Sequence, residues 1–210
     1  MEPTNKLPVF KLKVKRESAT ADTPEDQQEY IALVDHPAVE LECFYFASHN
    51  QSEKFKFAFD EERQIITGVA LVAEMPIKRK MKLPGQTVES EFYVVFDKPT
   101  IFEFVQKFFR KGYTSNFIMH HSDTPEKEGI YLFESIFVDS SRGVVAPKMF
   151  EGVNDGSWII SLHVPDKAKW TQIKKDGIKG LSVQGFFGME YIRSEDEKVL
   201  DVIADLAKGE

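Results

Sequence analysis

The sequence has little of what several protein classes require. Its 210 residues contain one cysteine, Cys43, which cannot form an internal disulfide, and this suits a reducing compartment. No apolar run approaches the ~20 residues that a membrane-spanning helix needs. The start of the chain, Met1–Asn5, has no signal-peptide character. We therefore expect a soluble, intracellular protein without a membrane partner.

A basic surface is missing as well. Lys and Arg number 27 against 34 Asp and Glu, which gives a net charge of −7. The run Lys78–Lys80 is too short to serve as a nucleic-acid footprint. The metal-ligand spacings Cys-x-x-Cys and His-x-x-x-His do not occur. We expect no nucleic-acid partner, no metal and no other cofactor.

Apolar residues, by contrast, are plentiful enough for one substantial core. They make up 42% of the chain, and phenylalanine alone occurs 18 times. Short segments of alternating apolar and polar residues indicate many strands. We predict a single domain over residues 29–210. Residues 1–28 mix charge, Pro and Thr with one short alternating run, Phe10–Val14, and are expected to form a loosely ordered arm.

Three helices are predicted among the strands. Apolar residues recur at helical spacing between Pro99 and Gly112, after Pro165 up to Gly177, and over about 195–208. The first helix precedes a strand that ends in two histidines, and the second precedes a strand that contains a serine. We expect residues 130–138 to pair with the histidine strand as a hairpin. The predicted fold class is α+β, mainly β.

Ser182 is the residue that most needs an explanation. It lies in the glycine-rich apolar segment Ile178–Glu190, which alternates like a buried strand. A hydroxyl there is either a nucleophile on a rigid strand, activated by a histidine, or a core serine bonded to a backbone carbonyl. The segment lacks Gly-x-Ser-x-Gly, so the nucleophile elbow of the α/β-hydrolases is not indicated.

His120 and His121 are the candidate bases. Because successive side chains of a strand point to opposite faces, just one of them can face a given site. Glu134, in the next predicted strand, is expected on an apolar face. Its expected neighbours there are Leu132, Ile136 and Val138. Such a carboxylate bonds either to an imidazolium or to solvent at a sheet edge, and the spacing favours neither. His163 is interpreted as an ordinary, satisfied strand histidine.

Several short motifs follow one another in a fixed order through the middle of the chain. They are Gln64–Val72, Met75–Ile77, Tyr93–Phe96, Met119-His120, Phe133–Ser135 with Val138-Asp139, Asp155–Trp158, Val164–Asp166 and Gly180–Phe186. In this order they resemble the phage prohead (procapsid) maturation serine proteases, in particular those assigned to PBSX-like prophages. The resemblance covers about residues 64–187. Proteins of this family look like distant relatives of the herpesvirus assemblins.

The resemblance implies a closed or partly open β-barrel of mostly antiparallel strands with peripheral helices. It implies that Ser182 is the nucleophile and that His120 or His121 takes its proton, with His120 preferred. Assemblins place a second histidine after the serine, and none follows Ser182 here. A carboxylate would then orient the base, and Glu134 is preferred to Asp123 and Glu190. The assemblin arginine pair is also missing, which leaves backbone amides near Gly180 or Gly185, or else Arg142, for the oxyanion.

The function that the resemblance implies is a serine endopeptidase of capsid maturation. It would cleave the scaffold and major capsid proteins inside the assembling phage prohead, in the host cytoplasm. Self-cleavage and homo-oligomerisation are further expectations. An alternative from another class is a catalytically inactive head-assembly protein that uses the same barrel to bind scaffold or portal.

Overall fold

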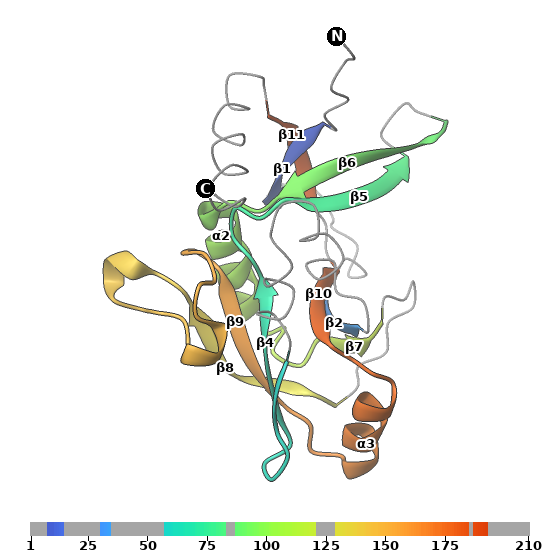
Figure 1. Ribbon diagram of the computed structural model, residues 1–210, viewed down its shortest axis with the longest axis vertical. Coiled ribbons are helices and arrows are strands. Elements are labelled where there is room, and N and C mark those ends of the chain that lie inside the picture. The colour runs from blue at the N-terminus through green and yellow to red at the C-terminus, as the bar shows by residue number, and fades with distance from the viewer. Residues whose placement is uncertain are drawn as a thin grey trace.

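The computed structural model describes residues 8–14, 30–34, 57–82, 87–120, 129–184 and 187–192. These residues form three β-sheets and two α-helices (Figure 1). The predicted fold class, α+β and mainly β, is confirmed. None of the sheets in these ranges closes on itself into a barrel. Among the described helices, none has the length and apolar character to cross a membrane.

The first sheet has the strand order β11-β1-β6-β5. Its strands are β1 (Val9–Val14), β5 (Ile77–Lys82), β6 (Glu89–Val95) and β11 (Phe187–Tyr191). β1 lies inside this sheet, antiparallel to β11 and parallel to β6. The expectation of a loosely ordered arm is therefore wrong for Val9–Val14, because both edges of this segment are paired and Leu12 and Val14 enter the core. The rest of residues 1–28, apart from Pro8, lies outside the described ranges.

The second sheet has the order β10-β2-β7. Its strands are β2 (Tyr30–Val34), β7 (Phe117–Met119) and β10 (Gly180–Gln184). β10 runs antiparallel to β2, and β2 runs parallel to β7. The predicted serine strand and histidine strand thus belong to one sheet, separated by a single strand.

The third sheet has the order β3-β4-β9-β8. Its strands are β3 (Ala58–Asp60), β4 (Ile65–Leu71), β8 (Tyr131–Phe137) and β9 (Trp158–His163). β8 pairs antiparallel with β9, so the predicted hairpin of residues 130–138 with the histidine strand is wrong. The physical reason is that β9, buried along nearly its whole length, offers β8 a long ladder, while β7 is already paired with β2.

Two helices lie where the sequence predicts them. α2 (Lys98–Arg110) begins at Asp97, whose side chain accepts a hydrogen bond from the Thr100 N–H, and α3 (Lys167–Lys175) begins at Asp166 in the same way. α2 buries Phe104 and Phe108 against Trp158, with ring centroids 6.0 and 5.4 Å apart. The predicted C-terminal helix over about 195–208 lies outside the described residues.

The second and third sheets approach each other at both edges. The Phe57 N–H donates to the Lys179 carbonyl at 3.4 Å, and the Leu132 N–H donates to the Thr114 carbonyl at 2.8 Å. Gly68 of β4 permits the first approach, because a Cβ there would come within 2.6 Å of the Phe57 ring.

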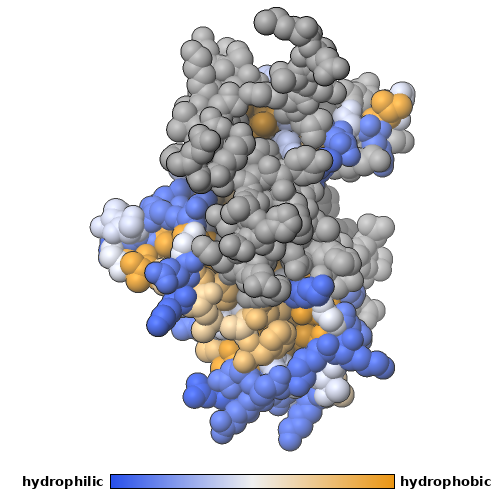
Figure 2. Space-filling view, in the orientation of Figure 1, coloured by the Kyte–Doolittle hydropathy of each residue, from blue (hydrophilic) through white to orange (hydrophobic). Residues whose placement is uncertain are grey.

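Apolar side chains from all three sheets share one main core. Some large apolar side chains are exposed at the surface. Phe59 is 39% exposed, and its ring lies 5.8 Å from the rings of both Phe57 and Trp170. Figure 2 shows an apolar area on the lower half of this face, bordered by hydrophilic residues.

Candidate functional site

Ser182 is a nearly buried strand serine, with 8% of its surface exposed. Its neighbours Leu181 and Val183 pack into the main core. Since side chains alternate along a strand, Ser182 lies on the opposite face of the second sheet. Ala32, its partner on β2, belongs to a small apolar cluster with Val34 and Ile118. The hydroxyl therefore sits on a second, separately packed face of this sheet.

His120 follows directly after β7 on the same sheet. Ala32 is paired with both Ser182 and Ile118, so these three residues form one row across the strands. The His120 N–H donates to the Leu33 carbonyl at 2.9 Å, and its φ of 57° turns the chain away from the strand. Two strand spacings, ~10 Å, separate β10 from β7. Ala32, in the middle of this row, is fully buried.

His121 and Asp123 lie outside the described residues, as does Cys43. Gly180 is paired with Val34 on β2, while Gly185 is also outside the described ranges. The second sheet therefore contributes Ser182, Gly180 and the end of the histidine strand to one neighbourhood. Of the other described candidates, Glu134 lies on the third sheet, Glu190 on the first, and Arg142 in the connection between β8 and β9.

Glu134 lies on the third sheet, and its partner is a hydroxyl. The Ser161 Oγ–H donates to Glu134 Oε2, and Ser161 Oγ lies 3.0 Å from Thr67 Oγ1. Glu134 shares its face with Ile136 and Val138, as predicted, but the prediction for Leu132 is wrong. The strand register shifts between Leu132 and Glu134, which reverses the alternation at this point.

Glu190 and Arg142 also have other partners. Glu190, on β11 of the first sheet, forms an ion pair with Lys13 at 3.8 Å. Arg142 lies in the connection between β8 and β9, where its Nε donates to Asp139 at 2.9 Å. These partners tie both side chains to structural positions outside the second sheet.

His163 is a residue whose interest the sequence does not reveal. Its Nδ1 is buried and has no hydrogen-bond partner in the described part of the chain, so the prediction of a satisfied histidine is wrong. The ring lies 5.2 Å from that of Tyr131, its partner on β8. Ser161, two positions earlier, shares its face. Ser161, but not His163, is bonded to Glu134.

An ion network fixes the connection between β8 and β9 onto the start of α2. The Lys98 ammonium group contacts the carboxylates of Asp139, at 3.0 Å, and Asp155. Hydrogen bonds from the Ser141 hydroxyl and from Lys98 lower the pKa of Asp139 from 3.8 to about 2. The pKa of Asp155 is lowered by Lys98 and by the Ser140 N–H, while both carboxylates raise the pKa of Lys98.

We expect this network to make stability fall in acid. The pKa of Asp139 is lower in the folded chain than its ordinary value of 3.8, so its stabilising effect is present above pH ~4 and lost as the pH falls toward about 2. Melting temperatures measured from pH 5 to pH 2 should drop for the wild type. Asp139→Asn should flatten part of that drop, and an unchanged slope would contradict the assignment.

Comparison with known proteins finds no match for this chain. No protein-family model matches the chain, and no curated protein and no solved structure matches it significantly. The chemistry of the site therefore has to be argued from its own residues.

Proposed function

We propose that this chain is a serine endopeptidase of the prohead-maturation type, with Ser182 as its nucleophile and His120 or His121 as its base. The observation that supports this most is the sheet β10-β2-β7, which carries Ser182 on one outer strand and His120 directly after the other. A rigid strand is a favourable support for a nucleophile, because the packing of its neighbours fixes the side chain. Leu181 and Val183 supply that packing.

We infer in addition that the second and third sheets form a barrel-like ring. The support comes from the backbone hydrogen bonds at both of their edges, Phe57 to Lys179 and Leu132 to Thr114. Main-chain contacts of this kind reduce the number of open strand edges. α3 follows β9 and leads into β10, and Figure 1 shows it at the lower right, below β10 and β7.

The proposed chemistry proceeds through an acyl-enzyme. The imidazole accepts the proton of Ser182 Oγ as this oxygen bonds to the scissile carbonyl carbon, and it then donates the proton to the leaving amine. Water releases the acyl group by the reverse sequence. Glu134 is not assigned to orient the base, because its carboxylate is bonded to Ser161. The site then acts as a Ser-His dyad, with Asp123 as the carboxylate nearest to the histidines in sequence.

The proposed substrates are the scaffold and major capsid proteins of the same phage, with self-cleavage as an additional reaction. We expect co-expression with these two proteins to produce new termini in the scaffold, mapped by mass spectrometry. The readout is made on assembled proheads, because an assembly protease meets its substrates there. Assembled proheads with uncut scaffold and capsid proteins would contradict the protease and favour a head-assembly protein.

A further inference from the structure

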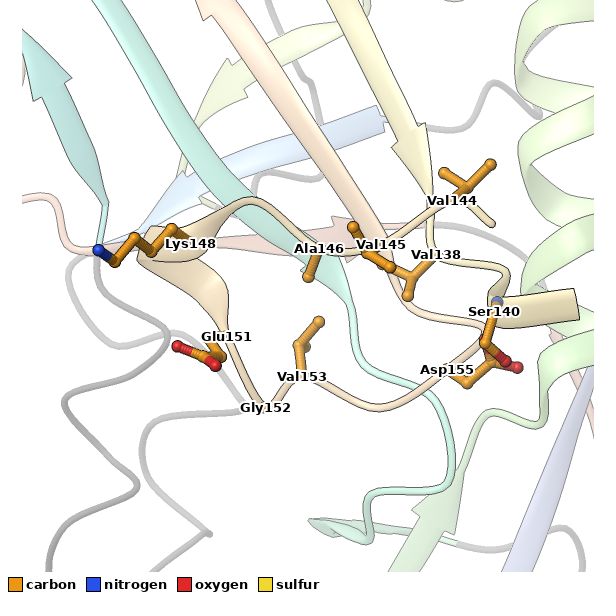
Figure 3. Close-up of a pocket in the computed structure, with 10 residues that line it drawn as sticks. All are labelled: Val138, Ser140, Val144, Val145, Ala146, Lys148, Glu151, Gly152, Val153 and Asp155. Atoms are coloured by element: carbon orange, nitrogen blue, oxygen red, sulfur yellow. The ribbon is translucent and has the colours of Figure 1, made fainter. Parts of the chain in front are cut away.

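The connection between β8 and β9 contains a cavity of about 550 Å³ (Figure 3). Its volume lies within the ~300–1,000 Å³ range of ligand sites. The central part is aliphatic. It is lined by Val138, Val145, Ala146 and Val153. Val138 and Val153 belong to the apolar cluster on the outer face of the third sheet, with Ala146 packed against it, so the cavity is separate from the face that carries Ser182.

One end of the cavity carries two charges of opposite sign. Figure 3 shows Lys148 and Glu151 there, at the opposite end from Ser140 and Asp155. Neither Lys148 nor Glu151 has an ion pair or a side-chain hydrogen bond within the described residues, and both are exposed. The Asp155 carboxylate, in contrast, is already bonded to Lys98 and to the Ser140 N–H. The free charges at the first end are thus available to a ligand with charges of its own.

The backbone beside the cavity is also unpaired. Val144 exchanges two hydrogen bonds with Asp139, at 2.8 and 2.9 Å, and Lys148 begins the short turn η4 (Lys148–Phe150). Between these points, the N–H and C=O groups of Val145 and Ala146 make no hydrogen bond to any described part of the chain. Val145 is 72% exposed. Open main-chain groups beside an aliphatic cavity suit an extended polypeptide, which adds its own backbone to such an edge.

We propose that this cavity binds an extended polypeptide segment. The main chain of the segment pairs with Val145 and Ala146, one aliphatic side chain enters the cavity, and the charged residue on one side of it meets Lys148 and Glu151. A small apolar molecule would use neither the open backbone nor the charges. The proposal does not rest on the proteolytic activity, because it concerns binding at a site separate from Ser182.

The test uses blocked, fluorescently labelled pentapeptides of the form Lys-Thr-X-Thr-Glu, where X is Val, Ile or Leu. Titration by fluorescence anisotropy should give saturable binding at or below about 1 mM. Methylation of the backbone nitrogen of X should weaken binding by about fivefold to tenfold, because it removes one donor. Replacement of X by Asp should abolish binding. Absence of saturable binding for all three peptides, or equal binding of the methylated forms, would overturn the proposal.

Val145→Pro is the matching change in the protein. It deletes an unbonded N–H on an exposed residue, so the fold should persist in circular dichroism while peptide binding is lost. Val88→Pro is the control, since Val88 is 68% exposed and lies outside the cavity. If Val145→Pro unfolds the chain, Lys148→Glu takes its place. It leaves two carboxylates at this end, which should then favour a lysine over a glutamate in the peptide.

Sedimentation distinguishes a peptide from a second copy of the chain. If Val145→Pro converts a dimer into a monomer and leaves peptide binding unchanged, the occupant is a second copy and the proposal fails. If peptide binding disappears with no change in the sedimentation of the free protein, the proposal stands.

Discussion

Replacing Ser182 with alanine is expected to lower cleavage of the scaffold protein by at least about 10⁴-fold, because a nucleophile and its base act as a unit. The same change should lower the free energy of unfolding by no more than about 1–2 kcal/mol, the effect of one buried hydrogen bond. Cleavage is measured by co-expression and mass spectrometry, and stability by urea unfolding. A variant that still folds but no longer cleaves separates a catalytic serine from a structural one.

Ser161→Ala is the matched control. Ser161 is also a buried strand serine, 2% exposed, and it has a carboxylate partner in Glu134 and a histidine two positions away. The Ser161→Ala variant should keep its cleavage activity. The reverse result, with Ser182→Ala active and Ser161→Ala inactive, would move the nucleophile to the third sheet. His120→Ala and His121→Ala should differ sharply, since one of the two rings serves Ser182.

Local patterns predicted the two described helices and several strands well. α2 and α3 have an aspartate at their N-cap and apolar residues at helical spacing, and such signals depend on neighbours in sequence. Strand pairing was predicted less well, because its partners are remote. β1 was interpreted as part of an arm, although β6 and β11 pair with it from much later in the chain. The partner of β7 is parallel, and a parallel pair has no tight turn that marks it in the sequence.

The residues of the candidate site were likewise predicted where the signal is local, and missed where it depends on remote strands. The alternation around Ser182 predicted its strand, and β10 confirms that strand. The neighbours of Glu134 were predicted in part, because a register shift in β8 adds a residue that period-two patterns do not reveal. The unbonded Nδ1 of His163 results from packing between strands, so no local pattern could have indicated it.

Gly156→Ala should cause the largest loss of stability, about 3–5 kcal/mol. Gly156 has a φ of 89°, and a Cβ there would lie 2.5 Å from the Lys98 Cβ and 3.1 Å from the Lys98 Cα. Lys98 cannot easily move away, because Asp139 and Asp155 hold its ammonium group. The Gly156 N–H also donates to the Val138 carbonyl at 2.8 Å. Urea unfolding should show the loss as a lower midpoint.

The loss in Gly156→Ala has two causes, backbone strain at a positive φ and a clash with Lys98. Gly143→Ala separates them. Gly143 has a φ of 74°, but a Cβ there would meet no atom within 4 Å. Its alanine variant should therefore lose about 1–2 kcal/mol from backbone strain alone. The difference between the two variants measures the clash with Lys98. Equal losses would show that Lys98 moves freely, and the ion network would then not fix the connection between β8 and β9 onto α2. A larger loss for Gly156→Ala is expected because the network and the close packing act on the same lysine.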